Sequence, residues 1–255
     1  ILHENTDGLM IGVHTSEEEQ VFAAEFSWRV AKKHVTKESL QDWQAPDKYV
    51  PPSDLVELPR GEQNVEHLAA DYLQVQGECF YVENSLSTGV FGLYFWDIIF
   101  APIAGAFYNP FQYAPSDFST PDFIEQRKTL ILKRLESLSE EDIHDRVWRV
   151  WRDKQGRANP LVHWSGLSEA LLILALERVP LAHWRAIFIR LLRDLRNHRN
   201  GFPDLIHFPK SGDYQWVEIK GPGDTLQKNQ VRWMAYFAQQ GIPHRTLHIR
   251  YSDDG

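Results

Sequence analysis

The sequence predicts an α/β fold in which helices flank a β-sheet and a helical segment precedes this core. The first observation behind this prediction is the stretch 201–220, where two short apolar runs lie on either side of a turn rich in Pro, Ser and Gly, as in a β-hairpin. The second is a run of strand composition at 244–251, which follows the hairpin after one helix. Much of the remaining chain has apolar residues at helical spacing.

The size and composition are typical of a globular protein. The chain of 255 residues is long enough to bury a sizeable core, and its single cysteine, Cys79, is typical of a reducing compartment. The most apolar run, 86–107, is interrupted by Asp97 and Pro102, so we expect no membrane span. We expect an intracellular protein, in the cytoplasm or nucleoid of a bacterium or in the nucleus of a eukaryote. Because the first residue is Ile, we expect a fragment of a longer chain.

The formal net charge of −8 argues against indiscriminate binding to nucleic acid, but this charge is unevenly distributed. Acidic residues are concentrated in residues 1–60, whereas two later stretches are basic. One stretch contains Arg146, Arg149, Arg152, Lys154 and Arg157, and the other contains Arg185, Arg190, Arg193, Arg196 and Arg199. Local basic patches of this kind bind phosphates.

Residues 1–60 are predicted to be the end of a helical region followed by a linker. Thr15 and Glu18 have the spacing of a capping box, which predicts a helix that runs to about Val35. Residues 41–60 contain four prolines and no sustained period, which indicates a linker. We therefore expect the main domain to cover residues 61–255.

Helices are predicted through most of the main domain before the hairpin. Their expected ranges are 62–76, 84–100, 123–138, 140–156, 168–179 and 181–199, with a short strand or turn at 161–164. The segment 84–100 is apolar on nearly all sides, so it should be buried. After the hairpin, Asp224 and Gln227 have capping-box spacing for a helix that ends near Gln240. We therefore expect Asp224 to cap that helix.

Two carboxylates and a lysine lie at one end of the predicted hairpin. In a hairpin, the residue numbers of paired residues add up to the same value along both strands. A turn centred on Ser211 therefore places Asp204 opposite Glu218. Lys220 is two residues beyond Glu218 and projects to the same face. Opposed like charges destabilise a sheet unless a partner such as a metal ion lies between them. The alternative is a solvated strand end, which the apolar character of the hairpin disfavours.

Two further groups of charged residues have open interpretations. Glu83 directly precedes the predicted buried helix, where an acid can either interact with the helix dipole or complete an acidic triad with the hairpin. On the helix predicted at 181–199, Arg185, Arg193, Arg196 and Arg199 fall near one face. This face is either solvated or binds nucleic-acid phosphates.

Two carboxylates beside a lysine are suited to phosphodiester hydrolysis. Divalent cations held by carboxylates neutralise charge on the in-line transition state and generate hydroxide near neutral pH. A lysine beside the metal site can stabilise developing phosphate charge, or orient and deprotonate the attacking water.

The pattern formed by Pro203-Asp204 and Glu218-Ile219-Lys220 resembles the PD-(D/E)xK nuclease superfamily. Its surroundings are similar to the virus-type replication-repair nuclease (VRR-NUC) domain, through residues 201–205, 217–222, Asp224 and Gln230. Upstream, Glu83, residues 94–100 and residues 161–164 resemble the Fanconi-associated nuclease family in particular. The resemblance covers residues 62 to 250 and implies a restriction-endonuclease-like core with a mixed β-sheet.

The resemblance also implies an activity and a set of site residues. The implied activity is that of a structure-specific DNA nuclease, with endonuclease and 5′–3′ exonuclease action on 5′ flaps and branched DNA in interstrand crosslink repair, using Mg²⁺ or Mn²⁺ at two sites. The implied metal ligands are Glu83, Asp204, Glu218 and the Ile219 carbonyl, with Lys220 as catalytic lysine and Gln112 near the active site. The expected DNA contacts are Arg193, Arg196, Arg199, Lys228 and Gln230.

Family members precede the nuclease with helical repeats and a DNA-binding module, so the implied partners are branched or 5′-flap DNA and the N-terminal remainder of the same protein. Two alternatives remain open. A Holliday-junction resolvase-like nuclease would cut symmetrically as a dimer, whereas the long helices at 123–199 favour a monomer. A non-catalytic scaffold for branched DNA would have lost at least one of the catalytic side chains. Asp204, Glu218 and Lys220 are all present, which favours an enzyme.

Overall fold

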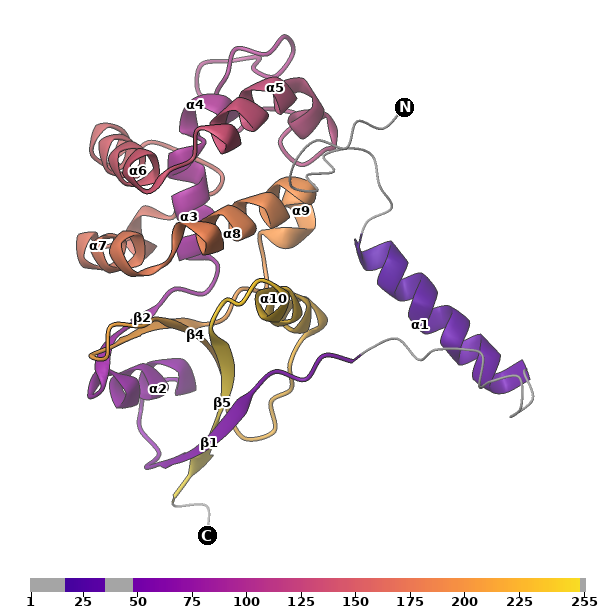
Figure 1. The fold of residues 1–255 in the computed structure, drawn as a ribbon, viewed down its shortest axis with the longest axis vertical. Coiled ribbons are helices and arrows are strands. Elements are labelled where there is room, and N and C mark those ends of the chain that lie inside the picture. The colour runs from indigo at the N-terminus through magenta and orange to yellow at the C-terminus, as the bar shows by residue number, and fades with distance from the viewer. Residues whose placement is uncertain (1–16, 35–47, 253–255) are drawn as a thin grey trace. The chain divides into compact units, whose positions relative to one another are not determined.

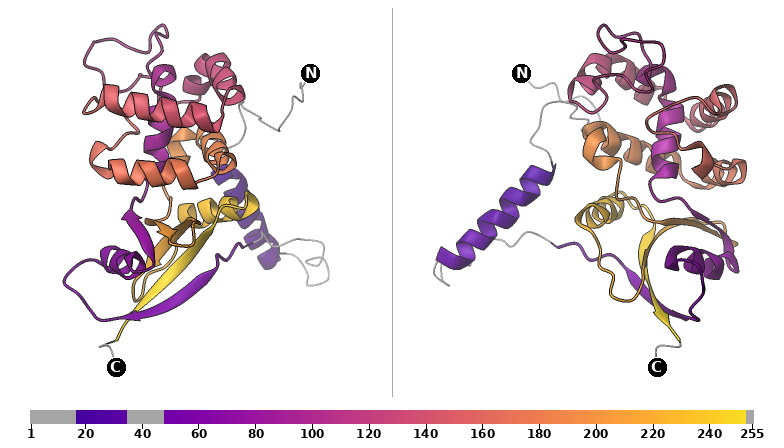
Figure 2. Two further views of the ribbon diagram at one scale, coloured as in Figure 1. Left: turned by 60° about the vertical axis from the view of Figure 1, so that its left-hand side comes forward. Right: turned by 180° about the vertical axis from the view of Figure 1, so that it is seen from behind.

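The computed structural model describes residues 17–34 and 48–252. Helix α1 (Glu17–His34) belongs to a compact unit that covers residues 12–50, and the chain from Pro51 onward belongs to a second unit (Figures 1 and 2). The predicted N-terminal helix is confirmed by α1, while Thr15 of its predicted capping box lies outside the described residues. No described helix is long and apolar enough to cross a membrane.

A five-stranded mixed sheet forms the core of the second unit, with the strand order β1-β5-β4-β3-β2. The strands are β1 (Ser53–Leu58), β2 (Gly77–Tyr81), β3 (Leu205–Pro209), β4 (Gln215–Lys220) and β5 (His244–Tyr251). Strands β1 and β4 both run parallel to β5, whereas β3 is antiparallel to its neighbours β4 and β2. The predicted α/β class with a mixed sheet is confirmed.

The hairpin formed by β3 and β4 has the predicted register. Leu205 pairs with Val217 and His207 with Gln215. Continued by one residue, this register places Asp204 across from Glu218. The turn between the strands contains Gly212 at φ 102°, in the region that glycine adopts without a steric penalty. The closing strand β5 is also confirmed at the predicted residues.

Two strands were not foreseen from the sequence, and the linker interpretation is wrong for residues 53–58. Strand β1 lies at the edge of the sheet with most of its residues exposed, so the alternation of apolar and polar residues that marks a half-buried strand is weak there. Gly77 ends the predicted helix, but it also begins β2. A Cβ atom at Gly77 would lie 2.1 Å from the carbonyl oxygen of Phe208, so only glycine permits this close strand pairing.

The helices after α1 occupy the ranges predicted for them, with ends that differ by a few residues. They are α2 (Val65–Gln74), α3 (Ser85–Tyr94), α4 (Trp96–Ile99), α5 (Asp122–Glu136), α6 (Glu140–Lys154), α7 (Glu169–Arg178), α8 (Leu181–Arg193), α9 (Leu195–His198) and α10 (Lys228–Gln239). The segment predicted as a strand or turn at 161–164 leads into a single 3₁₀ turn at Trp164–Gly166.

Three predicted helical features differ in the structure. The helix predicted at 84–100 is divided at Phe95 into α3 and α4. The helix predicted at 181–199 is interrupted at Asp194, whose side chain accepts a hydrogen bond from the Asn197 N–H and so starts α9 as a separate helix. Asp224 does not cap α10. That helix is capped by Gln227 in a capping box with Gln230, and Asp224 Oδ2 instead accepts a hydrogen bond from the Gly221 N–H at 3.0 Å.

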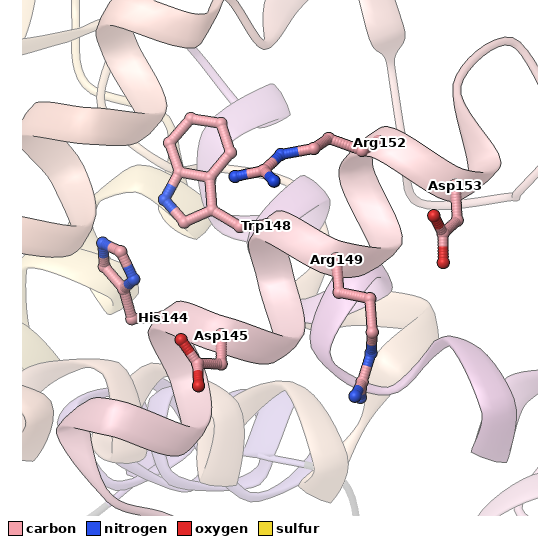
Figure 3. Close-up of a pocket in the computed structure, with 6 residues that line it drawn as sticks. All are labelled: His144, Asp145, Trp148, Arg149, Arg152 and Asp153. Carbon is pink, nitrogen blue, oxygen red and sulfur yellow. The ribbon is translucent and has the colours of Figure 1, made fainter.

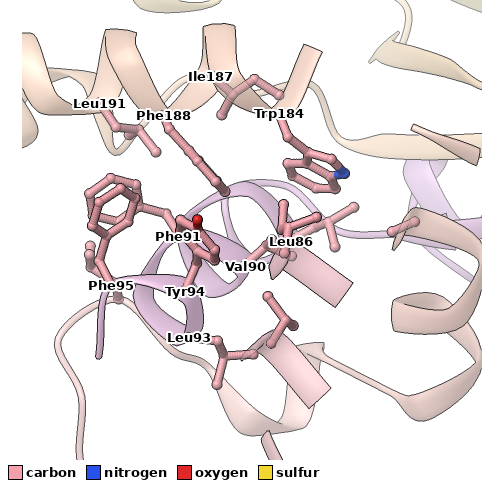
Figure 4. Packing of buried hydrophobic residues seen from close by; sticks show 14 of the residues in the cluster. Leu86, Val90, Phe91, Leu93, Tyr94, Phe95, Trp184, Ile187, Phe188 and Leu191 are labelled. Carbon is pink, nitrogen blue, oxygen red and sulfur yellow. The ribbon is translucent and has the colours of Figure 1, made fainter. Parts of the chain in front are cut away.

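Helices cover both faces of the sheet, with α2 and α10 on opposite sides of β5 (Figures 1 and 2). Strand alternation divides the core accordingly. Val217 and Ile219 of β4 pack with α2, whereas Trp216 joins the larger cluster that contains α10 and the helical layer. In that layer, side chains of α3 such as Phe91 pack against Phe188 of α8 (Figure 4).

Candidate active site

The chain that leads into Asp204 is fixed on two sides. Gly201 has φ 94°, and a Cβ atom there would lie 2.9 Å from the backbone of Asn229, so this position requires glycine. The Asn84 Oδ1 accepts hydrogen bonds from the N–H groups of Gly201 and Phe202, at 2.9 and 3.2 Å. Phe202 packs against Trp233 of α10 with 3.9 Å between the ring centroids. Asp204 therefore projects from a rigid segment.

Asp204 contacts both neighbouring strands. Its Oδ2 accepts a hydrogen bond from the Ile219 N–H at 2.8 Å, and its backbone carbonyl accepts from the N–H groups of Val82 and Glu83, at 2.8 and 2.9 Å. Burial raises the pKa of Asp204 to about 6, against the opposing effects of the Ile219 N–H and the Lys220 charge. This carboxyl is held in position while retaining a proton more readily than a solvated aspartate.

Glu218 is completely buried, at 0% exposure. The Lys220 Nζ lies 2.7 Å from its Oε1, and its Oε2 has no hydrogen-bond partner among the described residues. Burial and, to a smaller extent, the neighbouring Asp204 charge raise the pKa of Glu218 to about 7, against the opposing effect of Lys220. A buried carboxylate oxygen without a partner is costly, which is a reason to expect that a cation satisfies it.

Glu83 lies beside Asp204 through its backbone, and its side chain is held by two neighbouring residues. The Glu83 carboxylate accepts hydrogen bonds from the Tyr81 Oη at 2.9 Å and from the Asn84 Nδ2 at 3.2 Å. Its φ of 38° is in the left-handed region, which is unusual for a residue other than glycine. Across the described residues, no group of three or more His, Cys, Asp or Glu side chains is placed to hold one metal ion.

Gln112 is not brought together with the acids. Its Nε2 donates hydrogen bonds to the carbonyls of Ala106 and Ala114, and its Oε1 accepts from the Tyr108 N–H. These contacts all lie within the loop between α4 and α5, at the end of the helical layer farthest from the sheet (Figures 1 and 2). The structure thus gives Gln112 a role in organising that loop.

The residues predicted to contact DNA have mixed surroundings. Arg193 and Arg196 are exposed on either side of the interruption at Asp194, and Arg199 is half-buried. Lys228 is exposed at the start of α10, whereas the Oε1 of Gln230 accepts the Gln227 N–H within the capping box. The prediction that Arg185, Arg193, Arg196 and Arg199 share one helix face is wrong. The helix is interrupted at Asp194, and the Arg185 side chain donates a hydrogen bond to the Leu135 carbonyl.

The second basic stretch lines a shallow cavity on α6. Its volume is about 260 Å³, and its lining residues are His144, Asp145, Trp148, Arg149, Arg152 and Asp153 (Figure 3). The Arg152 guanidinium lies over the Trp148 ring, 5.8 Å from its centroid. Two acids on the same surface, Asp145 and Asp153, offset the positive charge of the arginines, so this surface is less basic than the arginines alone would make it.

Sequence reasoning did not single out Glu66, Tyr81 or Asn84. Burial raises the pKa of both Asp204 and Tyr81, and the Glu66 charge adds a smaller effect in the same direction, which indicates that the first turn of α2 lies near the acids. Tyr81 and Asn84 flank Glu83 and bind its carboxylate. The sequence points to Tyr81 and Asn84 only because they lie within two residues of Glu83. It points to Glu66 only because Glu66 lies at the start of a predicted helix.

The residues present fit a divalent cation. Asp204 directly precedes β3 and Glu218 lies on the paired strand β4; both carboxyl groups are largely buried, and one of their oxygens lacks a partner among the described residues. Hard cations such as Mg²⁺ and Mn²⁺ prefer carboxylate oxygens. Together, the mixed sheet and the set formed by Asp204, Glu218 and Lys220 define a nuclease of the PD-(D/E)xK class.

Comparisons with known proteins place the chain more narrowly. The VRR-NUC domain family matches residues 138–250. A Fanconi-associated nuclease 1 homolog of Pseudomonas aeruginosa is 42% identical over 193 residues, which cover 75% of this chain and 34% of the relative. Fanconi-associated nuclease 1 of Homo sapiens is 30% identical over 196 residues, which cover 73% of this chain and 19% of the relative. The chain belongs to the Fanconi-associated nuclease family.

A solved structure supports the same assignment. The crystal structure of paFAN1 bound to 1-nucleotide 5′-flap DNA with a gap is similar to this chain, with a TM-score of 0.82 and 35% sequence identity. The match covers 93% of this chain and 44% of that chain. The chain thus spans less than half of the solved relative and about a third of the bacterial relative, at 34%.

Proposed function

We propose that this chain is the catalytic part of a structure-specific DNA nuclease that hydrolyses phosphodiester bonds at 5′ flaps and branched DNA in interstrand crosslink repair. The observation that carries the proposal is the buried Glu218 carboxylate, with one unpartnered oxygen, across from Asp204 and 2.7 Å from the Lys220 Nζ. Perturbed acids beside a lysine are typical of catalytic sites. The flap DNA bound to the solved relative supports the substrate class.

Asp204 and Glu218 would hold Mg²⁺ or Mn²⁺, with Glu83 and the Ile219 carbonyl as further ligands and with two ions in total. A bound divalent cation supplies hydroxide near neutral pH and neutralises charge on the transferring phosphate. Asp204 is oriented for this role by the Ile219 N–H. Lys220 carries a cationic group to the same site, where it stabilises the developing phosphate charge or orients the attacking water.

Four cationic side chains and one amide side chain would bind the DNA. The proposed contacts are Arg193, Arg196, Arg199, Lys228 and Gln230. We place the start of the nuclease domain at Pro51, because β1 belongs to the sheet, and assign α1 to the helical region that precedes it. We further propose that the protein acts inside the cell as a monomer, with the rest of the full-length protein adding DNA contacts.

A panel of labelled DNAs tests this function. The proposal predicts cleavage of a 5′ flap with Mg²⁺ or Mn²⁺, weaker cleavage of a 3′ flap or single strand, and no cleavage in EDTA. Symmetric cuts in a four-way junction by a dimer would instead support a junction resolvase. Tight binding of every branched DNA without cleavage in either metal would support a scaffold module.

A further inference from the structure

Tyr81 is joined by a hydrogen bond to Glu83, the residue whose backbone N–H binds the Asp204 carbonyl. Its Oη donates to the Glu83 Oε2 at 2.9 Å, while 42% of its surface remains exposed. Tyr81 ends β2 and is paired with Leu205, the residue after Asp204. The phenol therefore reaches Glu83 from the same sheet that carries the two hairpin acids.

The ring of Tyr81 has its own support. His67 of α2 stacks on it with 5.4 Å between ring centroids and 24° between ring planes. His67 is fixed in turn by Asn64, the N-cap of α2, whose Oδ1 accepts from the His67 backbone N–H and also contacts the His67 Nδ1. A chain of contacts thus runs from a helix cap to the Glu83 carboxylate.

The two oxygens of Glu83 are held unequally. Tyr81 binds Oε2 at 2.9 Å, whereas the Asn84 Nδ2 binds Oε1 at the longer distance of 3.2 Å. Asn84 is also engaged by the Gly201 and Phe202 N–H groups through its Oδ1, so it connects Glu83 to the segment that leads into Asp204. The weaker bond leaves Oε1 as the oxygen that is more easily released.

We infer that Tyr81 is a positioning residue that holds Glu83 by Oε2 and thereby presents Oε1 to a divalent cation at the Asp204–Glu218 pair. The inference rests on the proposed role of Glu83 as a metal ligand. Residues that hydrogen-bond a ligating carboxylate fix its orientation, and their loss costs about 10- to 100-fold in metal affinity or activity. Removing the hydroxyl while keeping the ring should have an effect of this size.

Calorimetric titration of Mn²⁺ into the full chain, without DNA, tests the inference. Tyr81→Phe should weaken Mn²⁺ binding by about 10- to 100-fold while leaving the metal-free melting temperature unchanged. Tyr113→Phe is the matched control, because Tyr113 is an exposed tyrosine at 63% on the loop between α4 and α5, and it should bind like wild type. Saturating Mn²⁺ should restore flap cleavage by Tyr81→Phe but not by Glu83→Gln.

A third variant tests the positioning role of Tyr81 separately from the proposed metal site. Asp204→Ala should abolish binding of Mn²⁺ if the site assignment is right. Loss of binding in Asp204→Ala together with wild-type affinity in Tyr81→Phe would overturn the positioning role alone. Wild-type affinity in Asp204→Ala would overturn the metal site, and the positioning role with it. Equal losses in Tyr81→Phe and Tyr113→Phe would also contradict a specific role for Tyr81.

Discussion

The Lys220 Nζ lies 2.7 Å from the Glu218 Oε1, and the two residues are neighbours on one face of β4. A buried ion pair is a weak source of stability, because the desolvation of two charges offsets their attraction. Here the acid also has a raised pKa and an unpartnered oxygen. Such an arrangement is better explained by chemistry at the site than by folding stability.

In the metal-free protein, the Asp204–Glu218 pair should contribute less stability as pH rises. Burial raises the pKa of Asp204 to about 6 and that of Glu218 to about 7, so the folded state binds protons that the unfolded chain releases. Their contribution is fully present below about pH 4 and is lost as pH rises to about 7. Glu218 alone accounts for a change on the order of 3 kcal/mol. Urea unfolding in EDTA at pH 5 and pH 8 measures it.

Glu218→Gln is the control for this pH dependence. The variant removes the group with the larger shift, so its free energy of unfolding should change less between pH 5 and pH 8. Glu78→Gln, an exposed glutamate on β2, should retain the wild-type dependence. An equal change in stability between the two pH values in wild type and in Glu218→Gln would contradict the raised pKa of Glu218.

The two hairpin acids could be predicted from the sequence because their pairing is local. The register of β3 and β4 follows from the turn between them, and it places Asp204 across from Glu218. The surroundings of Glu83 could not be predicted in this way. Tyr81 reaches the acids through the pairing of β2 with β3, and Glu66 through the packing of α2 against the sheet; both join distant parts of the chain.

Local signals also failed where side chains compete with the backbone or where a strand is exposed. Asp194 lies within a helical pattern, yet its carboxylate binds the Asn197 backbone and interrupts the helix. Strand β1 has no fully buried residue, and only Val56 and Leu58 are half-buried against the core, so its alternation is weak. The loop-organising role of Gln112 depends on three hydrogen bonds that no spacing rule reveals.

Glu83→Gly should be more stable than Glu83→Ala. Glu83 has φ 38°, and left-handed backbone costs a non-glycine residue about 1 to 2 kcal/mol. Both variants should lose flap cleavage, but the glycine variant should have a free energy of unfolding about 1 kcal/mol above that of the alanine variant. Denaturant unfolding compares the two. At an ordinary φ the order is reversed, so a more stable alanine variant would show that the backbone strain is absent.

Gln112→Ala should act on stability rather than on chemistry. The variant removes three hydrogen bonds within the loop between α4 and α5, which should lower the free energy of unfolding by about 1 to 3 kcal/mol. Flap cleavage well below the melting temperature should stay near wild type. Ser116→Ala, which removes a single side-chain hydrogen bond to Gly105, serves as a milder control. A large loss of cleavage with an unchanged melting temperature would return Gln112 to the active site.

Replacement of Arg193 and Arg196 by Ala should weaken flap binding and flatten its salt dependence. Each lost phosphate contact should reduce the slope of log affinity against log salt by about one unit, independent of DNA sequence. The matched control replaces Arg149 and Arg152 on α6, where two acids offset the arginines. A change of slope in the α6 variant alone would mean that the DNA follows α6 instead.

The central claim is that Asp204 and Glu218 hold the cation with which this chain cuts DNA. Single-turnover cleavage of a labelled 5′ flap in Mg²⁺ by wild type, Asp204→Ala and Glu218→Ala, with DNA affinity measured in parallel, tests it most directly. We predict that both variants bind the flap as wild type does, because phosphate contacts elsewhere dominate affinity, and that neither cuts it. Cleavage at the wild-type rate by either variant would contradict the claim.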